Sequence, residues 1–201
     1  MPQDTVILTR NNLHIKNGYF LALLEIKAQD FATDKASYQL DTYENGCSIL
    51  SCSFTDDNNA YYCVGIAYVF PEENKPNKGR ILVFSVEDGK LQLVIDKATK
   101  VFVYNLNAFN EKLLAGINQK IQLSKWGLHD DGSRELQSEC GHYGHILARY
   151  VQSRGDFILV GDLMKDISLL IYKHEEGAIE ERAHEKRNFK IMKLKTVKFW
   201  H

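Results

Sequence analysis

Short apolar runs separated by polar turns cover most of the chain from residue 47 onwards. Each run holds four to eleven residues rich in Ile, Leu, Val, Tyr and Phe, which is typical of β-strands rather than of helices. The runs fall into three groups of four: 47–54, 60–70, 80–86 and 90–97; then 101–109, 112–118, 120–126 and 134–140; then 146–151, 157–160, 167–172 and 178–183.

Turn-forming residues lie between the predicted strands. Glu87-Asp88-Gly89-Lys90 and Asp130-Asp131-Gly132 are typical of tight connections, and 71–80, with two of the three prolines, is expected to be a surface loop. Arg154-Gly155-Asp156 matches a short adhesion motif, but its place between two apolar runs favours a hairpin turn.

The groups resemble one another. In Phe109–Trp126 and Gly155–Lys173 an apolar strand ends near a glycine and is followed by a second strand, in which Ile121, Leu123 and Trp126 correspond to Ile167, Leu169 and Tyr172. A repeat of about 40–50 residues is typical of four-stranded propeller blades, although an ordinary β-sandwich of hairpins remains an alternative.

The pattern therefore predicts an all-β fold: a partial β-propeller of three four-stranded, WD40-like blades over residues 40–183. A closed ring usually has four to eight blades, so open sheet edges and self-association through them are expected. Residues 1–39 are a divergent segment in which Val6–Leu8 and Phe20–Ile26 are possible strands of a preceding blade.

Residues 184–201 form a basic tail with six Lys or Arg and one Glu. Ile191, Leu194 and Val197 are spaced by three, which fits an amphipathic helix, while a final strand fits nearly as well. A solvated end is the simpler interpretation, and possible nucleic-acid contacts would be made by Lys190, Lys193, Lys195, Lys198 and Trp200.

Composition changes this picture little. The 201 residues are 44% hydrophobic and 25% charged with a net charge of −1, so overall charge indicates no particular partner. The start carries no secretory pattern and Phe20–Ile26 is too short to span a bilayer, so we expect an intracellular chain with reduced thiols.

Catalytic and metal-binding patterns are weak. Cys140, His142 and His145 could offer soft ligands, but their spacing is not that of a structural zinc site. Cys47, Cys52 and Cys63 lie in predicted strands and are expected to pack as small buried hydrophobes. Neither a phosphate-binding glycine loop nor a nucleophile elbow is found, so the sequence predicts no enzyme, no cofactor and no metal site.

Three long segments carry a family resemblance: LDTYENGCSILSCSFTDDNNAYYCVGIAYVF with GRILVF, LNAFNEKLLAGINQKIQL, and ECGHYGHILARYVQSRGDFILVGDLMKDISLLIYKHEEGAIEERA. Over about Leu40–Ala183 the chain closely resembles the large subunit of damaged-DNA-binding protein, in its plant form. The similar part is that family's third β-propeller, related to the large subunit of the cleavage and polyadenylation specificity factor, here as a shorter and divergent copy.

The resemblance implies an adaptor. In that family three propellers and a helical domain link a cullin-RING ubiquitin ligase to substrate-receptor proteins, in DNA repair and protein ubiquitination. The implied location is the nucleus, with the cytoplasm as a second one, and DNA is a further implied partner.

The family's receptor-contacting strand falls on Leu147-Ala148-Arg149-Tyr150, and its receptor-contacting turn on Leu163-Met164-Lys165. The resemblance thus implies a receptor-binding surface that contains Leu147, Ala148, Arg149, Tyr150, Leu163 and Lys165. At position 149 the family has Leu where this chain has Arg, which places a charge where the family has an apolar side chain.

Overall fold

The structure is a computed structural model that describes residues 5–9, 12–16, 37–55, 57–72, 78–88, 90–130, 132–144, 147–162 and 166–186. The described residues form fifteen strands and no helix, so none of them forms a helix of the length and apolar character needed to cross a membrane. The all-β prediction is confirmed.

Three four-stranded antiparallel sheets follow one another along the chain, and each is called a blade here. The first blade holds β4 (Glu44–Phe54), β5 (Asp57–Tyr68), β6 (Gly79–Glu87) and β7 (Lys90–Thr99). The second holds β8 (Val103–Phe109), β9 (Lys112–Ile117), β10 (Lys120–Leu128) and β11 (Arg134–Tyr143). The third holds β12 (Ala148–Arg154), β13 (Phe157–Asp162), β14 (Asp166–Lys173) and β15 (Ala178–Lys186). All twelve predicted strands of these blades are present.

A smaller sheet precedes the blades. Its strands β1 (Thr5–Thr9), β2 (Asn12–Lys16) and β3 (Ser37–Gln39) are ordered β2-β1-β3, and β1 includes the predicted strand Val6–Leu8. The other predicted strand, Phe20–Ile26, lies outside the described residues.

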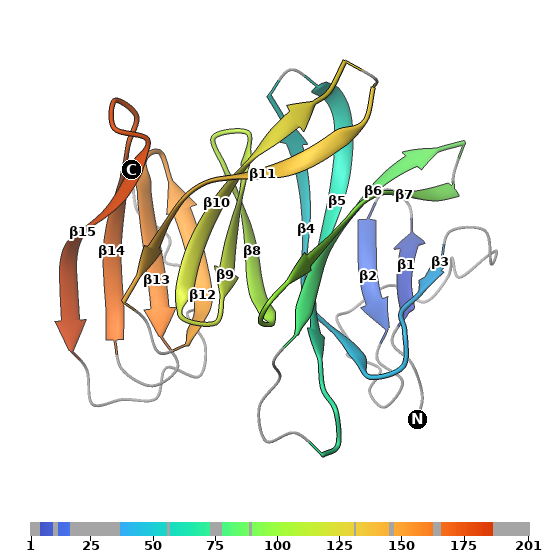
Figure 1. Cartoon of the computed structure of the whole chain (residues 1–201), viewed down its shortest axis with the longest axis horizontal. Coiled ribbons are helices and arrows are strands. Elements are labelled where there is room, and N and C mark those ends of the chain that lie inside the picture. Colours follow the sequence, from blue (N-terminus) through green and yellow to red (C-terminus); the bar gives the residue numbers. More distant parts are fainter. Residues whose placement is uncertain are drawn as a thin grey trace.

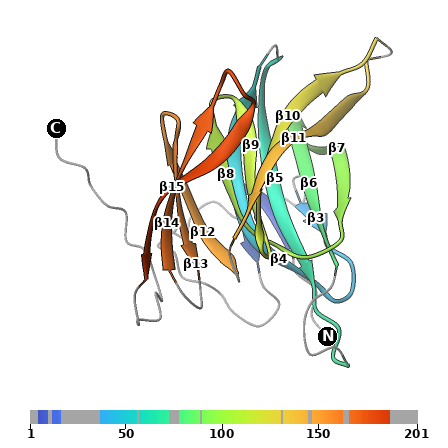
Figure 2. The ribbon, with the colours of Figure 1, turned by 60° about the vertical axis from the view of Figure 1, so that its left-hand side comes forward.

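The blades stand face to face in chain order, like part of a fan (Figure 1). Their first strands β4, β8 and β12 lie side by side on the inside, and their last strands β7, β11 and β15 form the outer side. The turned view of Figure 2 keeps the first and third blades on opposite sides of the second. This is the arrangement of a propeller, in which blades pack by their faces, rather than that of a two-sheet sandwich.

Two apolar layers hold the blades together. The layer between the first and second blades includes Phe54, Tyr61, Val103 and Leu136, and Trp126 stacks on Phe54 with ring centroids 4.3 Å apart. The layer between the second and third blades is made by Phe109, Leu114, Ile121, Leu123, Ala148, Val151, Ile158, Val160, Leu170, Tyr172 and Ile179. Burial of these side chains is the main force that keeps neighbouring blades together.

The tight turns use residues suited to a left-handed backbone. Asn110 and Glu111 both have positive φ, 45° and 57°, as a two-residue hairpin loop between β8 and β9 requires. Gly155, with φ +55°, joins β12 to β13, so the Arg154-Gly155-Asp156 motif is a hairpin turn as predicted.

Candidate partner-binding rim

The first strand of every blade carries a β-bulge at the same place. The register between the first and second strands skips Cys47 in the first blade, Tyr104 in the second and Arg149 in the third. A bulge re-aims the side chain of the extra residue, and bulges are common beside binding sites. The three bulge residues and Tyr150 are called the inner rim here.

The bulge residues of the first and third blades lie near enough to Tyr104 to act on its hydroxyl electrostatically. Burial raises the pKa of the Tyr104 hydroxyl, Cys47 raises it further, and the positive charge of Arg149 opposes the rise. Tyr104 is therefore a neutral hydrogen-bonding group at neutral pH, with an edge-to-face contact to Phe102 at a centroid distance of 4.2 Å.

Arg149 is exposed, and its guanidinium carbon lies 5.9 Å from the centre of the Tyr150 ring. A cation over an aromatic face is stabilised without an acidic partner. The charge at position 149 is thus accommodated at the surface, where it can meet an acidic group of a partner.

The backbone around Arg149 is fixed on both sides. The Leu147 amide donates a hydrogen bond to Oδ2 of Asp162 at 3.1 Å, and the Ala148 amide donates to the Asn118 carbonyl at 2.8 Å. Asp162 is 3% exposed, so its carboxylate accepts the bond from the Leu147 amide in a buried position. The strand is therefore held in place before any partner arrives.

The structure separates the predicted site residues. Arg149 and Tyr150 belong to the inner rim and Leu147 is half-buried beside them, whereas Ala148 is fully buried against the second blade. Leu163, Lys165 and the predicted nucleic-acid contacts Lys190, Lys193, Lys195, Lys198 and Trp200 lie outside the described residues.

Sequence reasoning missed the rim residues Cys47 and Tyr104. The expectation of burial is right for Cys52 and Cys63, whose sulfurs lie 3.5 Å apart, and wrong for Cys47, which is exposed because the bulge turns its thiol outward. An alignment of residues 46–48 (GCS), 103–105 (VYN) and 148–150 (ARY) would have placed Cys47, Tyr104 and Arg149 at one shared position.

The rim has the chemistry of a contact surface. Its groups are a neutral phenol, a guanidinium, a second tyrosine and a thiol. Among the described residues, no three Cys, His, Asp or Glu side chains gather as metal ligands, and His145 lies outside them.

Residues 20–198 match the family model described as the CPSF A subunit region. The chain belongs to this family. It is 72% identical over 168 residues to DNA damage-binding protein 1b of Arabidopsis thaliana and 71% identical over 176 residues to DNA damage-binding protein 1a of the same plant. It is 70% identical over 167 residues to DNA damage-binding protein 1 of Oryza sativa subsp. japonica.

These alignments cover 84%, 88% and 83% of this chain but only 15%, 16% and 15% of the three relatives. The chain therefore corresponds to one propeller region of a much longer kind of protein. The resemblance seen in the sequence is confirmed, and the names of these relatives describe binding rather than catalysis.

Proposed function

We propose that this chain of the CPSF A subunit region family is a protein–protein interaction module that contacts a substrate-receptor protein of a cullin-RING ubiquitin ligase. The observation that carries the proposal is the inner rim: Arg149 and Tyr150 stand at an exposed bulge on the strand that matches the family's receptor-contacting strand. The proposal includes a role in DNA repair and protein ubiquitination, a nuclear location and no catalytic activity.

The expected partner is an amphipathic receptor helix. Tyr104 and Tyr150 offer flat apolar rings with hydroxyl ends, a combination that is common in protein interfaces. Because Arg149 stands where the family has Leu, the matching position of the receptor helix is expected to be acidic rather than apolar.

The test is retention of a purified plant receptor protein by the full chain. Tyr150→Ala should weaken retention about tenfold, the effect of losing one buried aromatic contact. The matched control is Tyr143→Ala, because Tyr143 is 69% exposed on the outer strand β11, away from the rim.

Arg149→Leu completes the set. If the receptor helix offers an acidic group, this variant retains less receptor than the wild type; if the helix is apolar, it retains more. The proposal fails if neither the wild type nor Arg149→Leu holds any receptor, or if both tyrosine variants lose the same amount.

A second candidate function is nucleic-acid binding through Lys190, Lys193, Lys195, Lys198 and Trp200, and it is favoured by the relatives, which are named DNA damage-binding proteins. Lysines that neutralise phosphates make binding fall steeply with salt. Fluorescence anisotropy with a labelled duplex should then show a log–log salt slope that becomes smaller when the four lysines are replaced by glutamine. A slope that does not change would contradict this candidate.

A further inference from the structure

Every blade carries the same four positions on one face, and in the first two blades the following blade packs on them. These positions, called the seat here, are two on the second strand and two on the third, and they pair directly across the ladder. The seats are Cys63, Gly65, Ile81 and Val83 in the first blade; Leu114, Gly116, Ile121 and Leu123 in the second; and Leu159, Gly161, Ile167 and Leu169 in the third.

The first two seats are covered by the first strand of the next blade, which approaches most closely at the glycine. A Cβ on Gly65 would lie 2.9 Å from Cγ1 of Val103, and a Cβ on Gly116 would lie 2.7 Å from the carbonyl oxygen of Ala148. Val103 and Ala148 are both fully buried. Glycine stands at this position because any side chain would occupy the space of the incoming strand.

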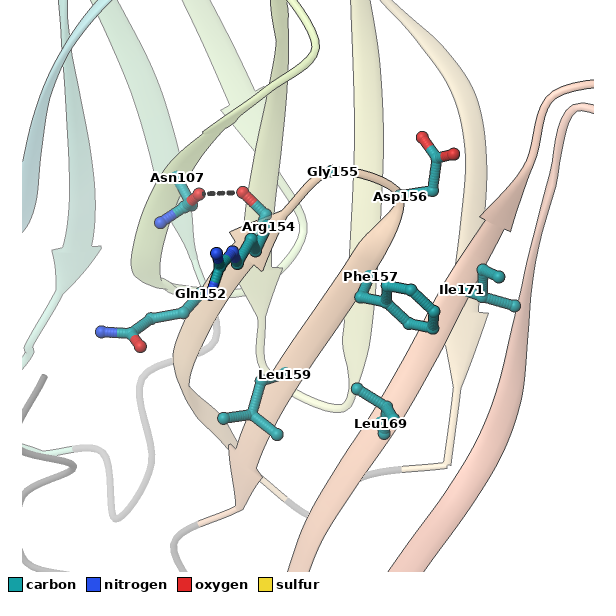
Figure 3. A pocket seen from close by; sticks show the side chains of 10 residues that line it. Asn107, Gln152, Arg154, Gly155, Asp156, Phe157, Leu159, Leu169 and Ile171 are labelled. Carbon is teal, nitrogen blue, oxygen red and sulfur yellow. Dashed lines mark hydrogen bonds between the residues drawn. The ribbon is translucent and has the colours of Figure 1, made fainter. Parts of the chain in front are cut away.

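The third seat has the same residues but is not covered by any element of the described chain. Leu159, Ile167 and Leu169 are partly exposed, and neighbouring Phe157 is 49% exposed. Figure 3 shows the side chains of Leu159, Leu169 and Phe157 along one side of a pocket. This pocket has a volume of ≈ 1120 Å³ and extends from these seat residues to Asn107 and Arg154. An apolar face of this kind on a soluble fold marks a contact surface.

The spacing along the chain indicates which segment belongs there. Three residues, 100–102, link the last strand of the first blade to Val103, and four residues, 144–147, link the second blade to Ala148. The third blade ends at Lys186, so a link of four residues, 187–190, leads to Ile191.

The residues from 191 onwards repeat the pattern of the first strands. Residues 103–108 (VYNLNA), 148–153 (ARYVQS) and 191–196 (IMKLKT) all show apolar, variable, polar, apolar, polar and small positions. The described apolar pairs Val103–Leu106 and Ala148–Val151 are spaced by three because a bulge lies between their members. Spacing by three in Ile191–Leu194 therefore fits a bulged strand as well as a helix.

We propose that residues 191–197 dock on the third seat as the first strand of a further blade. Ile191 lies on Gly161 as Val103 lies on Gly65, and Leu194 packs beside Leu159 as Val151 packs in one layer with Leu114. Lys193 and Lys195 point away from the seat.

A polar pair supports the alignment of residues 191–196 with the first strands at 103–108 and 148–153. The Ser153 hydroxyl lies 2.7 Å from Oδ1 of Asn107, so a small polar side chain of the incoming strand bonds an amide on the first strand of the preceding blade. In the proposed register Thr196 takes the place of Ser153, and Gln152 takes the place of Asn107. The partners of this bond are thus of the same chemical kind.

Disulfide trapping in the full chain tests the proposal. The Cβ of a residue at Gly65 would lie 3.3 Å from the Cβ of Val103, close to the roughly 3.5–4.5 Å found across disulfides. In a Cys47→Ser background, the pair Gly161→Cys with Ile191→Cys should therefore oxidise to an intrachain disulfide, which peptide mapping identifies.

Matched pairs give the control. In one control Gly161→Cys is combined with Lys193→Cys, and in another with Lys195→Cys. The chain between the two cysteines has nearly the same length in these pairs, but the second thiol points away from the seat. The disulfide should therefore form at least about tenfold more slowly. The pair Leu159→Cys with Leu194→Cys should also trap rapidly, and it leaves Gly161 in place if replacement of the glycine disturbs the sheet.

Three results would overturn the proposal. Equal rates of disulfide formation from positions 191, 193 and 195 to position 161 would show that the segment is not anchored on the seat. Rapid disulfide formation from both 191 and 195 would indicate a helix, because these two residues share one face of a helix. Disulfides between chains would mean that a second copy covers the seat. The proposal does not depend on the receptor-binding function, because disulfide trapping is measured on the chain alone, without a receptor.

Discussion

The second and third blades carry nearly the same seat in opposite environments. Leu114, Ile121 and Leu123 are fully buried in the apolar layer against the third blade, while Leu159 and Leu169 are partly exposed at the matching positions. The side chains hardly differ, so the difference in burial comes entirely from what lies against them. Three pairs of substitutions can break or sharpen this comparison.

The largest expected effect is on the leucine at the third strand of each seat. Leu123→Ala should lower the free energy of unfolding by about 3 kcal/mol, because a fully buried leucine leaves a cavity. Leu169→Ala should cost about 1 kcal/mol, because part of its side chain already meets water. Urea denaturation of both variants measures the two losses, and equal losses would show that the third seat is covered as completely as the second.

A smaller effect is expected at the glycines. Gly116→Ala should cost about 2 kcal/mol, because the new methyl group would lie 2.7 Å from the Ala148 carbonyl oxygen and force the blades apart. Gly161→Ala should cost less, about 1 kcal/mol, because the proposed strand 191–197 packs on Gly161 while the seat residues Leu159 and Leu169 stay partly exposed. Thermal melts followed by circular dichroism compare the two variants, and a loss at Gly161 as large as that at Gly116 would contradict the difference between the seats.

The smallest effect concerns charge. Glu139 of the second blade lies 2.7 Å from Nζ of Lys112 and also bonds the Tyr172 hydroxyl of the third blade. Burial raises the pKa of the Glu139 carboxyl, but the hydrogen bonds from Lys112 and Tyr172 outweigh it, so the pKa lies below its ordinary value.

A lowered carboxyl pKa stabilises the fold above the unfolded pKa of about 4.5, and this contribution is lost as the pH falls through the folded pKa. Glu139→Gln should therefore be less stable than the wild type at pH 7, with a difference that shrinks below pH 4.5. The control is Glu180→Gln, because Glu180 bonds Lys173 at 2.7 Å on the exposed side of the third blade and should contribute nothing measurable. Urea denaturation at pH 7 and pH 4 measures the free energy of unfolding of the wild type and both variants. A loss of stability in Glu139→Gln that is the same at both pH values would contradict the prediction.

Much of the fold followed from local pattern. The runs of apolar residues predicted all twelve strands of the three blades, because strand formation and burial on both faces demand Ile, Leu, Val and aromatic residues at consecutive positions. The inner rim was predicted only in part. Arg149 and Tyr150 came from the family resemblance, whereas Cys47 was expected to be buried, because a bulge changes the direction of a side chain without changing the apolar pattern.

The sequence by itself determined the strand order within each blade, the repeat of the seat and the family of the chain, since these depend on residue type and spacing. Only the tertiary structure decided that Cys47 and Arg149 act electrostatically on Tyr104 from the neighbouring blades, and that Leu123 is buried while Leu169 is partly exposed. The physical reason is that burial and electrostatic interaction depend on the surfaces that folding brings together. Residues of the same type therefore differ in exposure and in electrostatic environment when their neighbours differ.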